Sequence, residues 1–192
     1  MPKNSELRAA ARTQLRGGWL VAVGAVFIYC LLISLSSAVF GIGLIITGGP
    51  LTLGLCIFFL HKARGETAEF ENIFEGFKTF VPSLLVFILE GLFIFLWSLL
   101  LIVPGIIKTF SYSMAFFILR DNPGMSALDA ITASRKMMKG YKGRLFCLYL
   151  SFIGWILLSI ITFGIGFLWL YPYMFLSMTN FYENLKKVQP QP

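Results

Sequence analysis

The chain has 192 residues, of which 57% are hydrophobic and 13% are charged, and its formal net charge is +7. A soluble domain carries about 25% charged residues, so this composition excludes a water-soluble globular enzyme as the default interpretation. The positive charge points to nucleic acid or to a membrane surface, depending on where the basic residues lie.

Six apolar segments follow one another along the chain. They cover Trp19–Val39, Ile42–Leu60, Val81–Val103, Ile106–Leu119, Leu145–Thr162 and Ile165–Phe181. A membrane-spanning helix needs about 20 apolar residues, so the pattern predicts six spans, of which the fourth and sixth are short. The first segment is longer than the roughly 7–15 apolar residues of a signal peptide, so we expect an uncleaved helix there.

Every second connection between these segments is very short. Phe40-Gly41, Pro104-Gly105 and Phe163-Gly164 each join two segments, whereas Glu66–Lys78 and Asp121–Arg144 are longer and charged. Short connections make neighbouring helices antiparallel. The sequence therefore predicts an all-α, polytopic membrane protein with six transmembrane helices in three hairpins, and with amphipathic helices on the cytoplasmic side.

The basic residues mark one side of the membrane. Of the 16 lysines and arginines, all except Lys108 lie before the first segment, after the last one, between the second and third segments, or between the fourth and fifth. By the positive-inside rule that side is cytoplasmic, and both termini lie there. The net charge is then an orientation signal, and no nucleic acid partner is expected.

A short polar helix is predicted before each hairpin. Arg8, Arg12 and Arg16 form a stripe at helical spacing in the first helix, and Ser126 and Asp129 have the spacing of a capping box in the third. The second has an apolar face made of Phe70, Ile73, Phe74 and Phe77, with glutamates on another face.

These helices have two compatible interpretations. They can lie in the membrane interface with their basic side chains on anionic lipid. The residues predicted to contact anionic headgroups are Arg8, Arg12, Arg16, Arg135, Lys136, Lys139, Lys142 and Arg144. They can also cap the helix bundle, with the acidic second helix docked on the basic first and third.

The hairpins resemble one another. Gly17, Gly76 and Gly140 each close a polar helix and open a span. This pattern predicts a single membrane domain over residues 1–187 with candidate repeats at 4–62, 66–120 and 126–184, followed by a disordered tail at 188–192. The alternative is that glycine-rich membrane helices align by chance.

The search for catalytic motifs is negative. The chain has no phosphate-binding loop, no HExxH or GxSxG motif, and no cluster with metal-ligand spacing. We therefore expect a protein that is not an enzyme, without catalytic residues, cofactor or metal.

A carboxylate within the third apolar segment is the main candidate for chemistry. A charge in hydrocarbon costs roughly 2.5–3.5 kcal/mol, so Glu90 either forms a cation or proton site or is a neutral carboxyl bonded to a neighbouring helix. Lys108 is expected to reach the outer surface. The candidate intramembrane polar site consists of Glu90, Lys108, Tyr112 and Tyr173.

Glycine and proline interrupt the second helix of each hairpin or the turn before it. The candidate helix breaks are Gly49, Pro50, Pro104, Gly105 and Pro172, and a matching interruption is predicted at Ser111-Tyr112-Ser113. Interrupted helices expose backbone carbonyls that transporters use to hold ions and substrates. The simpler alternative is a kink whose backbone groups are satisfied by neighbouring helices.

Several short motifs resemble a known family, the bacterial integral-membrane proteins of domain-of-unknown-function family 975. They include Arg64-Gly65-Glu66, Phe74-Glu75-Gly76-Phe77, Pro104-Gly105-Ile106-Ile107-Lys108, Ser111-Tyr112-Ser113-Met114-Ala115, Asp121-Asn122-Pro123 and Met137-Met138-Lys139-Gly140. The resemblance extends from about Leu7 to Glu183. It implies a small polytopic protein of the bacterial cytoplasmic membrane, and it brings no activity, substrate or residue role.

Two functions remain open at this stage. The first is a non-enzymatic envelope protein that acts through membrane lipids on its cytoplasmic face, through membrane protein partners or as a homo-oligomer. The alternative is a small transporter or channel for an ion or small solute.

Overall fold

The computed structural model describes residues 1–37 and 42–189, and every regular element in them is helical. The elements are α1 (Asn4–Leu15), α2 (Trp19–Ser37), α3 (Ile42–Arg64), α4 (Asn72–Glu75), the 3₁₀ helix η1 (Gly76–Thr79), α5 (Phe80–Leu100), α6 (Ile102–Tyr112), α7 (Ala115–Asp121), α8 (Ala127–Met137), α9 (Lys142–Leu150), α10 (Ile153–Ile161) and α11 (Phe167–Val188). The tail predicted at 188–192 begins with the last residue of α11, and 190–192 lie outside the described residues.

Five stretches of the described chain are long and apolar enough to cross a membrane. They are Trp19–Ser37, Gly43–Arg64, Asn72–Leu100, Ile102–Asp121 and Lys142–Ile161, with mean hydropathies from 1.6 to 2.3. The sixth predicted span corresponds to α11, which has 22 residues but carries Asn180, Glu183 and Lys186 in its second half. These polar residues make α11 less apolar than the other five stretches.

The interruptions differ from those the sequence predicts. Helix α3 runs unbroken through Gly49 and Pro50, and α11 runs unbroken through Pro172. A proline removes one backbone donor, and a helix packed among others tolerates that loss. The regular helix is interrupted by single turns at Ser113-Met114 and at Ser151-Phe152, whose backbone angles stay in the right-handed helical region. The fourth and fifth predicted segments therefore each form two helices, and the first turn begins within the interruption predicted at Ser111-Tyr112-Ser113.

The three predicted turns have different outcomes. The Phe163-Gly164 turn is confirmed, with positive φ angles of 53° and 87° between α10 and α11. The turn predicted at Pro104-Gly105 is wrong by a few residues, because the chain reverses at the extended residue Leu101 and Pro104 lies in the first turn of α6. Proline is tolerated there, since its missing N–H would have no helical partner. The Phe40-Gly41 turn lies outside the described residues.

A serine lies against a glycine at each hairpin. Gly43, Gly105 and Gly166 each contact the serine seven residues earlier, and a Cβ atom on any of these glycines would collide with it. The serines are Ser36, Ser98 and Ser159. Two helices can approach this closely only where one has no side chain.

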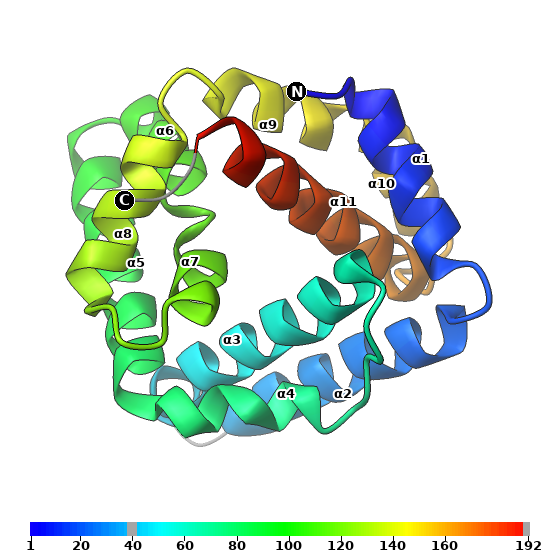
Figure 1. Ribbon diagram of the computed structural model, residues 1–192, viewed down its shortest axis with the longest axis horizontal. Coiled ribbons are helices and arrows are strands. Elements are labelled where there is room, and N and C mark those ends of the chain that lie inside the picture. The colour runs from blue at the N-terminus through cyan, green and yellow to red at the C-terminus, as the bar shows by residue number, and fades with distance from the viewer. Residues whose placement is uncertain (38–41, 190–192) are drawn as a thin grey trace.

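The helices form a ring around three inner helices, α3, α7 and α11 (Figure 1). Helices α4 and η1 pack on α3, α8 packs on α7 and α6, and α1 packs on α11. Each of the short helices thus lies on the hairpin that precedes it, and α1 closes the ring against the last one. The acidic second helix therefore docks on α3, and the predicted docking on the basic helices is wrong.

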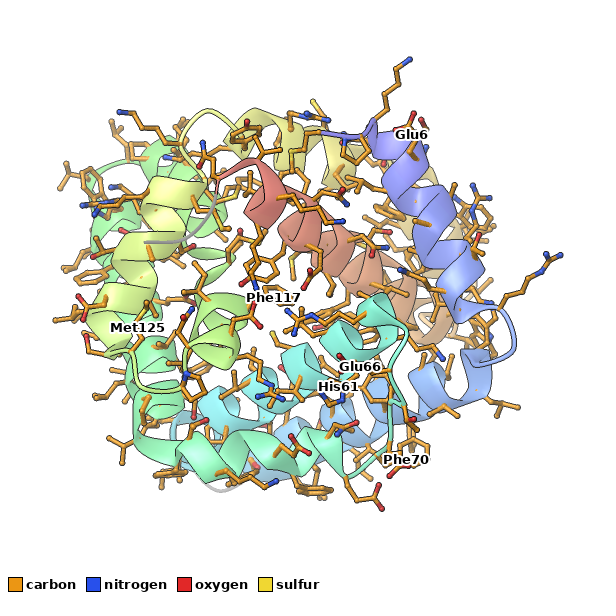
Figure 2. All side chains as sticks on the ribbon, viewed as in Figure 1. Glu6, His61, Glu66, Phe70, Phe117 and Met125 are labelled. Carbon is orange, nitrogen blue, oxygen red and sulfur yellow. The ribbon has the colours of Figure 1, made fainter. Side chains whose placement is uncertain are left out.

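Aromatic residues fill the middle of this ring. Phe117 points into it, whereas Phe70 lies near its outer edge (Figure 2). The ring centroids of Phe59 and Phe175 are 4.9 Å apart, and those of Phe117 and Phe175 are 6.0 Å apart, so α3, α7 and α11 share one core.

Large apolar side chains also cover the outside of the molecule. Leu99 on α5 and Ile161 on α10 are 67% and 73% exposed, and Phe74 on α4 is 51% exposed. An apolar surface this extensive has to be covered by lipid or by another protein. Phe70, Phe74 and Phe77 are each partly exposed, although the Phe70 ring lies against Gly24 on α2 and the Phe77 ring stacks on Phe80.

Candidate functional site

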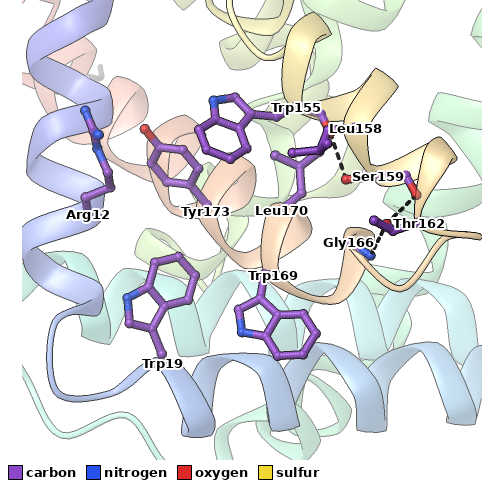
Figure 3. A pocket seen from close by; sticks show the side chains of 10 residues that line it. All are labelled: Arg12, Trp19, Trp155, Leu158, Ser159, Thr162, Gly166, Trp169, Leu170 and Tyr173. Atoms are coloured by element: carbon purple, nitrogen blue, oxygen red, sulfur yellow. Dashed lines mark hydrogen bonds between the residues drawn. The ribbon is translucent and has the colours of Figure 1, made fainter.

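A cavity of about 370 Å³ lies between α1, the start of α2, α10 and α11 (Figure 3). Arg12 reaches it from α1, Trp19 from α2, Trp155 from α10, and Trp169 and Tyr173 from α11. These elements meet because α1 packs along α11, and α10 and α11 are joined by a tight turn. We call this cavity the Arg12 pocket.

The polar groups at one end of the Arg12 pocket already have partners. Ser159 Oγ donates to the Trp155 carbonyl oxygen at 2.8 Å, and Thr162 Oγ1 donates to the Ser159 carbonyl oxygen at 3.0 Å. Thr162 Oγ1 also accepts the Gly166 N–H at 3.1 Å. These hydroxyls leave the pocket mainly aromatic and aliphatic.

Arg12 is the one charged residue in the lining. Its guanidinium carbon lies 6.0 Å from the centroid of the Tyr173 ring. Within the described chain it forms no hydrogen bond and no ion pair. A guanidinium presents five N–H donors and accepts nothing, so this end of the pocket suits a carboxylate or a phosphate.

The two ends of the pocket favour different parts of one ligand. The tryptophans offer apolar surface with a polar N–H, as they do at membrane interfaces, and Arg12 offers a positive charge. The volume lies in the range of roughly 300–1,000 Å³ typical of ligand sites. The arrangement therefore fits an amphiphile with an anionic head and an apolar chain.

The three arginines of the α1 stripe have different environments. Arg8 is half-buried, with Nη1 donating to the Ser151 carbonyl oxygen at 3.0 Å and the guanidinium 5.8 Å from the Phe152 ring centroid. Arg16 is exposed. Arg8 therefore fastens α1 to the junction of α9 and α10, while Arg12 faces the pocket.

The other residues predicted to contact lipid also differ in exposure. Arg144 Nη2 donates to the Pro2 carbonyl oxygen at 2.5 Å, so its charge is held against the N-terminal segment. Lys142 is half-buried, whereas Arg135, Lys136 and Lys139 are exposed. Ser126 caps α8, with its Oγ accepting the Asp129 N–H at 3.2 Å. The Asp129 carboxylate accepts from the Ser126 hydroxyl at 2.6 Å and not from the Ser126 backbone, so only half of the predicted capping box forms.

The predicted intramembrane polar residues lie in three places. Tyr173 belongs to the Arg12 pocket, and Lys108 and Tyr112 line a second cavity between α5, α6 and α8. Lys108 Nζ lies 4.2 Å from the centroid of the Trp97 ring. Glu90 lies apart from that lining, and its Oε1 is buried without a hydrogen-bond partner among the described residues.

The predicted helix breaks serve close packing. A Cβ atom on Gly49 would collide with the backbone of Ser83 on α5, and the Pro50 carbonyl oxygen contacts Gly76 on η1. Gly105 lies against Ser98 in the hairpin, and Pro172 is buried within α11.

An ion-pair cluster joins the ends of three helices, and the sequence interpretation missed it. Arg64 ends α3 and donates to both Asp121, at the end of α7, and Glu183, on α11, with shortest distances of 2.8 and 2.7 Å. Asp121 also accepts from Lys186 Nζ at 2.6 Å and from the Tyr182 hydroxyl at 2.9 Å. The sequence did contain a signal for this cluster, because basic and acidic residues stand at the ends of helices that were predicted to be neighbours.

Comparison with known proteins gives one match. The sequence pattern of the family described as "Protein of unknown function (DUF975)" matches residues 1–110 and 99–189. This match confirms the resemblance noted from the short motifs. No curated protein and no solved structure matches the sequence significantly.

Proposed function

Because the chain belongs to the DUF975 family of proteins of unknown function, its relatives bring no activity, and we propose one from the Arg12 pocket. The chain is a non-enzymatic integral protein of the bacterial cytoplasmic membrane that binds an anionic phospholipid in this pocket. The headgroup phosphate lies at Arg12, and one acyl chain lies along Trp155 and Trp169. Membrane lipids are its principal partners, and no nucleic acid is involved.

One observation carries the proposal: an unpaired arginine stands at the polar end of an aromatic pocket. A basic residue near anionic lipid contributes about 1 kcal/mol, and each buried CH₂ group of an acyl chain contributes about 0.8 kcal/mol. The two contributions act on the same molecule only if it carries both groups. A phospholipid does.

The proposed topology has six spans in three hairpins, with both termini in the cytoplasm. Five apolar stretches and the 22-residue helix α11 support the number of spans. The other 15 lysines and arginines precede, separate or follow the three hairpins in the sequence, and their placement supports the orientation. Lys108 adds no support, because it lines one cavity with Arg135 of α8, so the expectation that it reaches the outer surface is wrong. The short helices α1, α4 and α8 then lie at the cytoplasmic interface, where the exposed Phe70, Phe74 and Phe77 contact lipid.

We expect Arg12→Gln to weaken binding of phosphatidylglycerol about tenfold, because the charge-assisted contact to the phosphate is lost while the apolar pocket remains. The measurement uses purified protein in phosphatidylcholine discs containing phosphatidylglycerol with brominated acyl chains. Three of the four tryptophans line the pocket, so a bound brominated chain quenches their fluorescence.

Arg16→Gln is the matched control, because Arg16 lies on the same basic stripe, is exposed and does not line the pocket. It removes the same charge and should change the quenching curve by less than about twofold. Equal curves for the wild type and Arg12→Gln would reject the proposed site.

The alternative function, a small carrier or channel, is supported by the buried Glu90 Oε1, which has no partner among the described residues. Under the lipid-binding proposal, proteoliposomes show no proton or monovalent-cation flux above protein-free vesicles. A flux that Glu90→Gln abolishes, and that the exposed variant Glu71→Gln leaves intact, would favour the carrier.

A further inference from the structure

A second cavity, of about 250 Å³, lies between α5, α6 and α8. Lys108 and Tyr112 reach it from α6, Trp97 from α5, and Thr132 and Arg135 from α8. We call it the Lys108 pocket. Its lining includes two basic residues and no acidic one.

The Lys108 pocket occupies the same kind of position as the Arg12 pocket. The Arg12 pocket lies where α1 packs on α11, the second helix of the hairpin that α10 begins. The Lys108 pocket lies where α8 packs on α6, the second helix of the hairpin that α5 begins. In both, a short polar helix covers the hairpin that precedes it around the ring.

The arginines of the two pockets have equivalent places in their helices. Arg12 stands five residues before Gly17, and Arg135 stands five residues before Gly140. These glycines follow α1 and α8 and have nearly the same backbone angle, with φ of 82° and 85°. The two short helices therefore present their arginines in the same register.

The hairpin residues correspond as well. Tyr112 stands seven residues after Gly105, and Tyr173 stands seven residues after Gly166. Both glycines make the same contact with the serine seven residues earlier. An arginine on the covering helix and a tyrosine on the hairpin thus recur together.

The third junction of this kind, where α4 and η1 pack on α3, has neither the arginine nor the tyrosine at the equivalent positions. Glu71 stands five residues before Gly76, and Pro50 stands seven residues after Gly43. The backbone of Gly76 lies directly against the Pro50 carbonyl oxygen. This junction is closed by packing, so the ring contains two related pockets.

One of the differences between the two linings adds a positive charge. Three residues after the hairpin glycine, the Arg12 pocket has Trp169 and the Lys108 pocket has Lys108. Lys108 Nζ lies 4.2 Å from the Trp97 ring centroid, and its charge interacts with those of Arg135 and Lys142. Within the described chain, neither Lys108 nor Arg135 has an ion-pair partner.

We infer that the Lys108 pocket is a second anion site, and that it selects a lipid whose headgroup is a phosphate monoester. This inference rests on the proposed lipid-binding function and adds a second site with a different headgroup preference. A phosphate monoester carries about 1.5–2 negative charges near pH 7, whereas a phosphodiester carries one. Two cations with hydroxyls from Tyr112 and Thr132 match the monoester, and the single Arg12 matches the diester.

The test compares phosphatidic acid, a monoester, with phosphatidylglycerol, a diester. Wild-type protein in phosphatidylcholine discs containing both is analysed for retained lipid by native mass spectrometry. We expect Lys108→Gln to reduce retention of phosphatidic acid about tenfold and that of phosphatidylglycerol less than twofold. Arg12→Gln should do the reverse. Lys139→Gln, on an exposed residue after α8, should change neither.

Each negative result rejects a different site. Loss of phosphatidylglycerol with Arg12→Gln, and unchanged phosphatidic acid with Lys108→Gln and Arg135→Gln, would overturn the second site and leave the proposed function standing. Loss of phosphatidic acid with Lys108→Gln and no effect of Arg12→Gln would overturn the Arg12 site alone.

Two further measurements guard the interpretation. Lys108→Arg keeps the charge and should retain phosphatidic acid as the wild type does. Loss of phosphatidic acid with this variant as well, while phosphatidylglycerol is still retained at the Arg12 pocket, would show that the charge at position 108 does not hold the headgroup and would overturn the headgroup assignment. Millimolar inorganic phosphate should not displace phosphatidic acid, because free phosphate lacks the acyl chains that anchor the lipid. Displacement would identify free phosphate as the ligand and overturn the lipid assignment.

Discussion

Gly54→Ala is expected to lower the free energy of unfolding by more than about 3 kcal/mol. Gly54 on α3 lies directly against the backbone of Ile73 on α4, and Gly76 on η1 lies against the backbone at Pro50 on α3. A methyl group in this contact meets backbone atoms, which cannot rotate away as a side chain can. The crossing of α3 and α4 would have to separate.

Thermal unfolding of the purified protein in detergent, followed by circular dichroism, measures the effect. Gly91→Ala is the matched control, because a Cβ atom there meets nothing within 4 Å and alanine favours a helix by about 1 kcal/mol over glycine. We expect Gly91→Ala to unfold at or above the wild-type temperature. A Gly54→Ala protein as stable as the wild type would contradict the close packing of these helices.

Asp121→Ala is expected to cost about 3 kcal/mol of stability. The Asp121 carboxylate accepts from Arg64, Tyr182 and Lys186, with shortest distances of 2.8, 2.9 and 2.6 Å, and its side chain is only 10% exposed. Removing it takes away the acceptor shared by the ends of α3, α7 and α11. The loss stays at the lower end of the range for a broken buried pair, because Arg64 keeps its bond to Glu183.

The same unfolding measurement applies, with a surface ion pair for comparison. Lys78 lies 3.9 Å from Glu75 and its side chain is 77% exposed, so Lys78→Ala should cost less than about 1 kcal/mol. Asp121→Asn retains an oxygen acceptor, so its loss of stability should lie between those of Lys78→Ala and Asp121→Ala. If Asp121→Ala and Lys78→Ala unfold at the same temperature, the cluster does not hold the three helices together.

Much of the helical arrangement was predictable, because apolar segments and polar connections alternate so regularly. The start of α8 followed from the side-chain chemistry of Ser126 and Asp129, which is local. The breaks within the fourth and fifth segments also have a local cause. Ser113 Oγ donates to the Phe110 carbonyl oxygen and Ser151 Oγ donates to the Leu148 carbonyl oxygen, each three residues earlier. Such bonds compete with the helical ladder. The sequence indicated the first break at Ser111-Tyr112-Ser113, whereas the break at Ser151 was not predicted.

The candidate site was less predictable, because it depends on contacts between distant parts of the chain. The arginine stripe of α1 was evident at helical spacing. Only the packing of α1 on α11 determines that Arg12 faces a cavity beside Tyr173 while Arg8 bonds to Ser151. Likewise, Lys108 and Arg135 line the same cavity only because α8 packs on α6.

The closure of the ring by α1 has a consequence for biosynthesis. Arg8 bonds to a residue 143 positions later. At roughly 5–20 residues per second, a ribosome takes about 7–30 s to produce that partner, and longer to produce α11. During this interval the face of α1 formed by Leu7, Ala11 and Leu15, which is buried in the finished protein, has no helix to cover it. In the topology that we propose, this apolar face lies on the membrane surface until α11 is made, so we expect the lipid composition there to affect how much of the chain completes its fold.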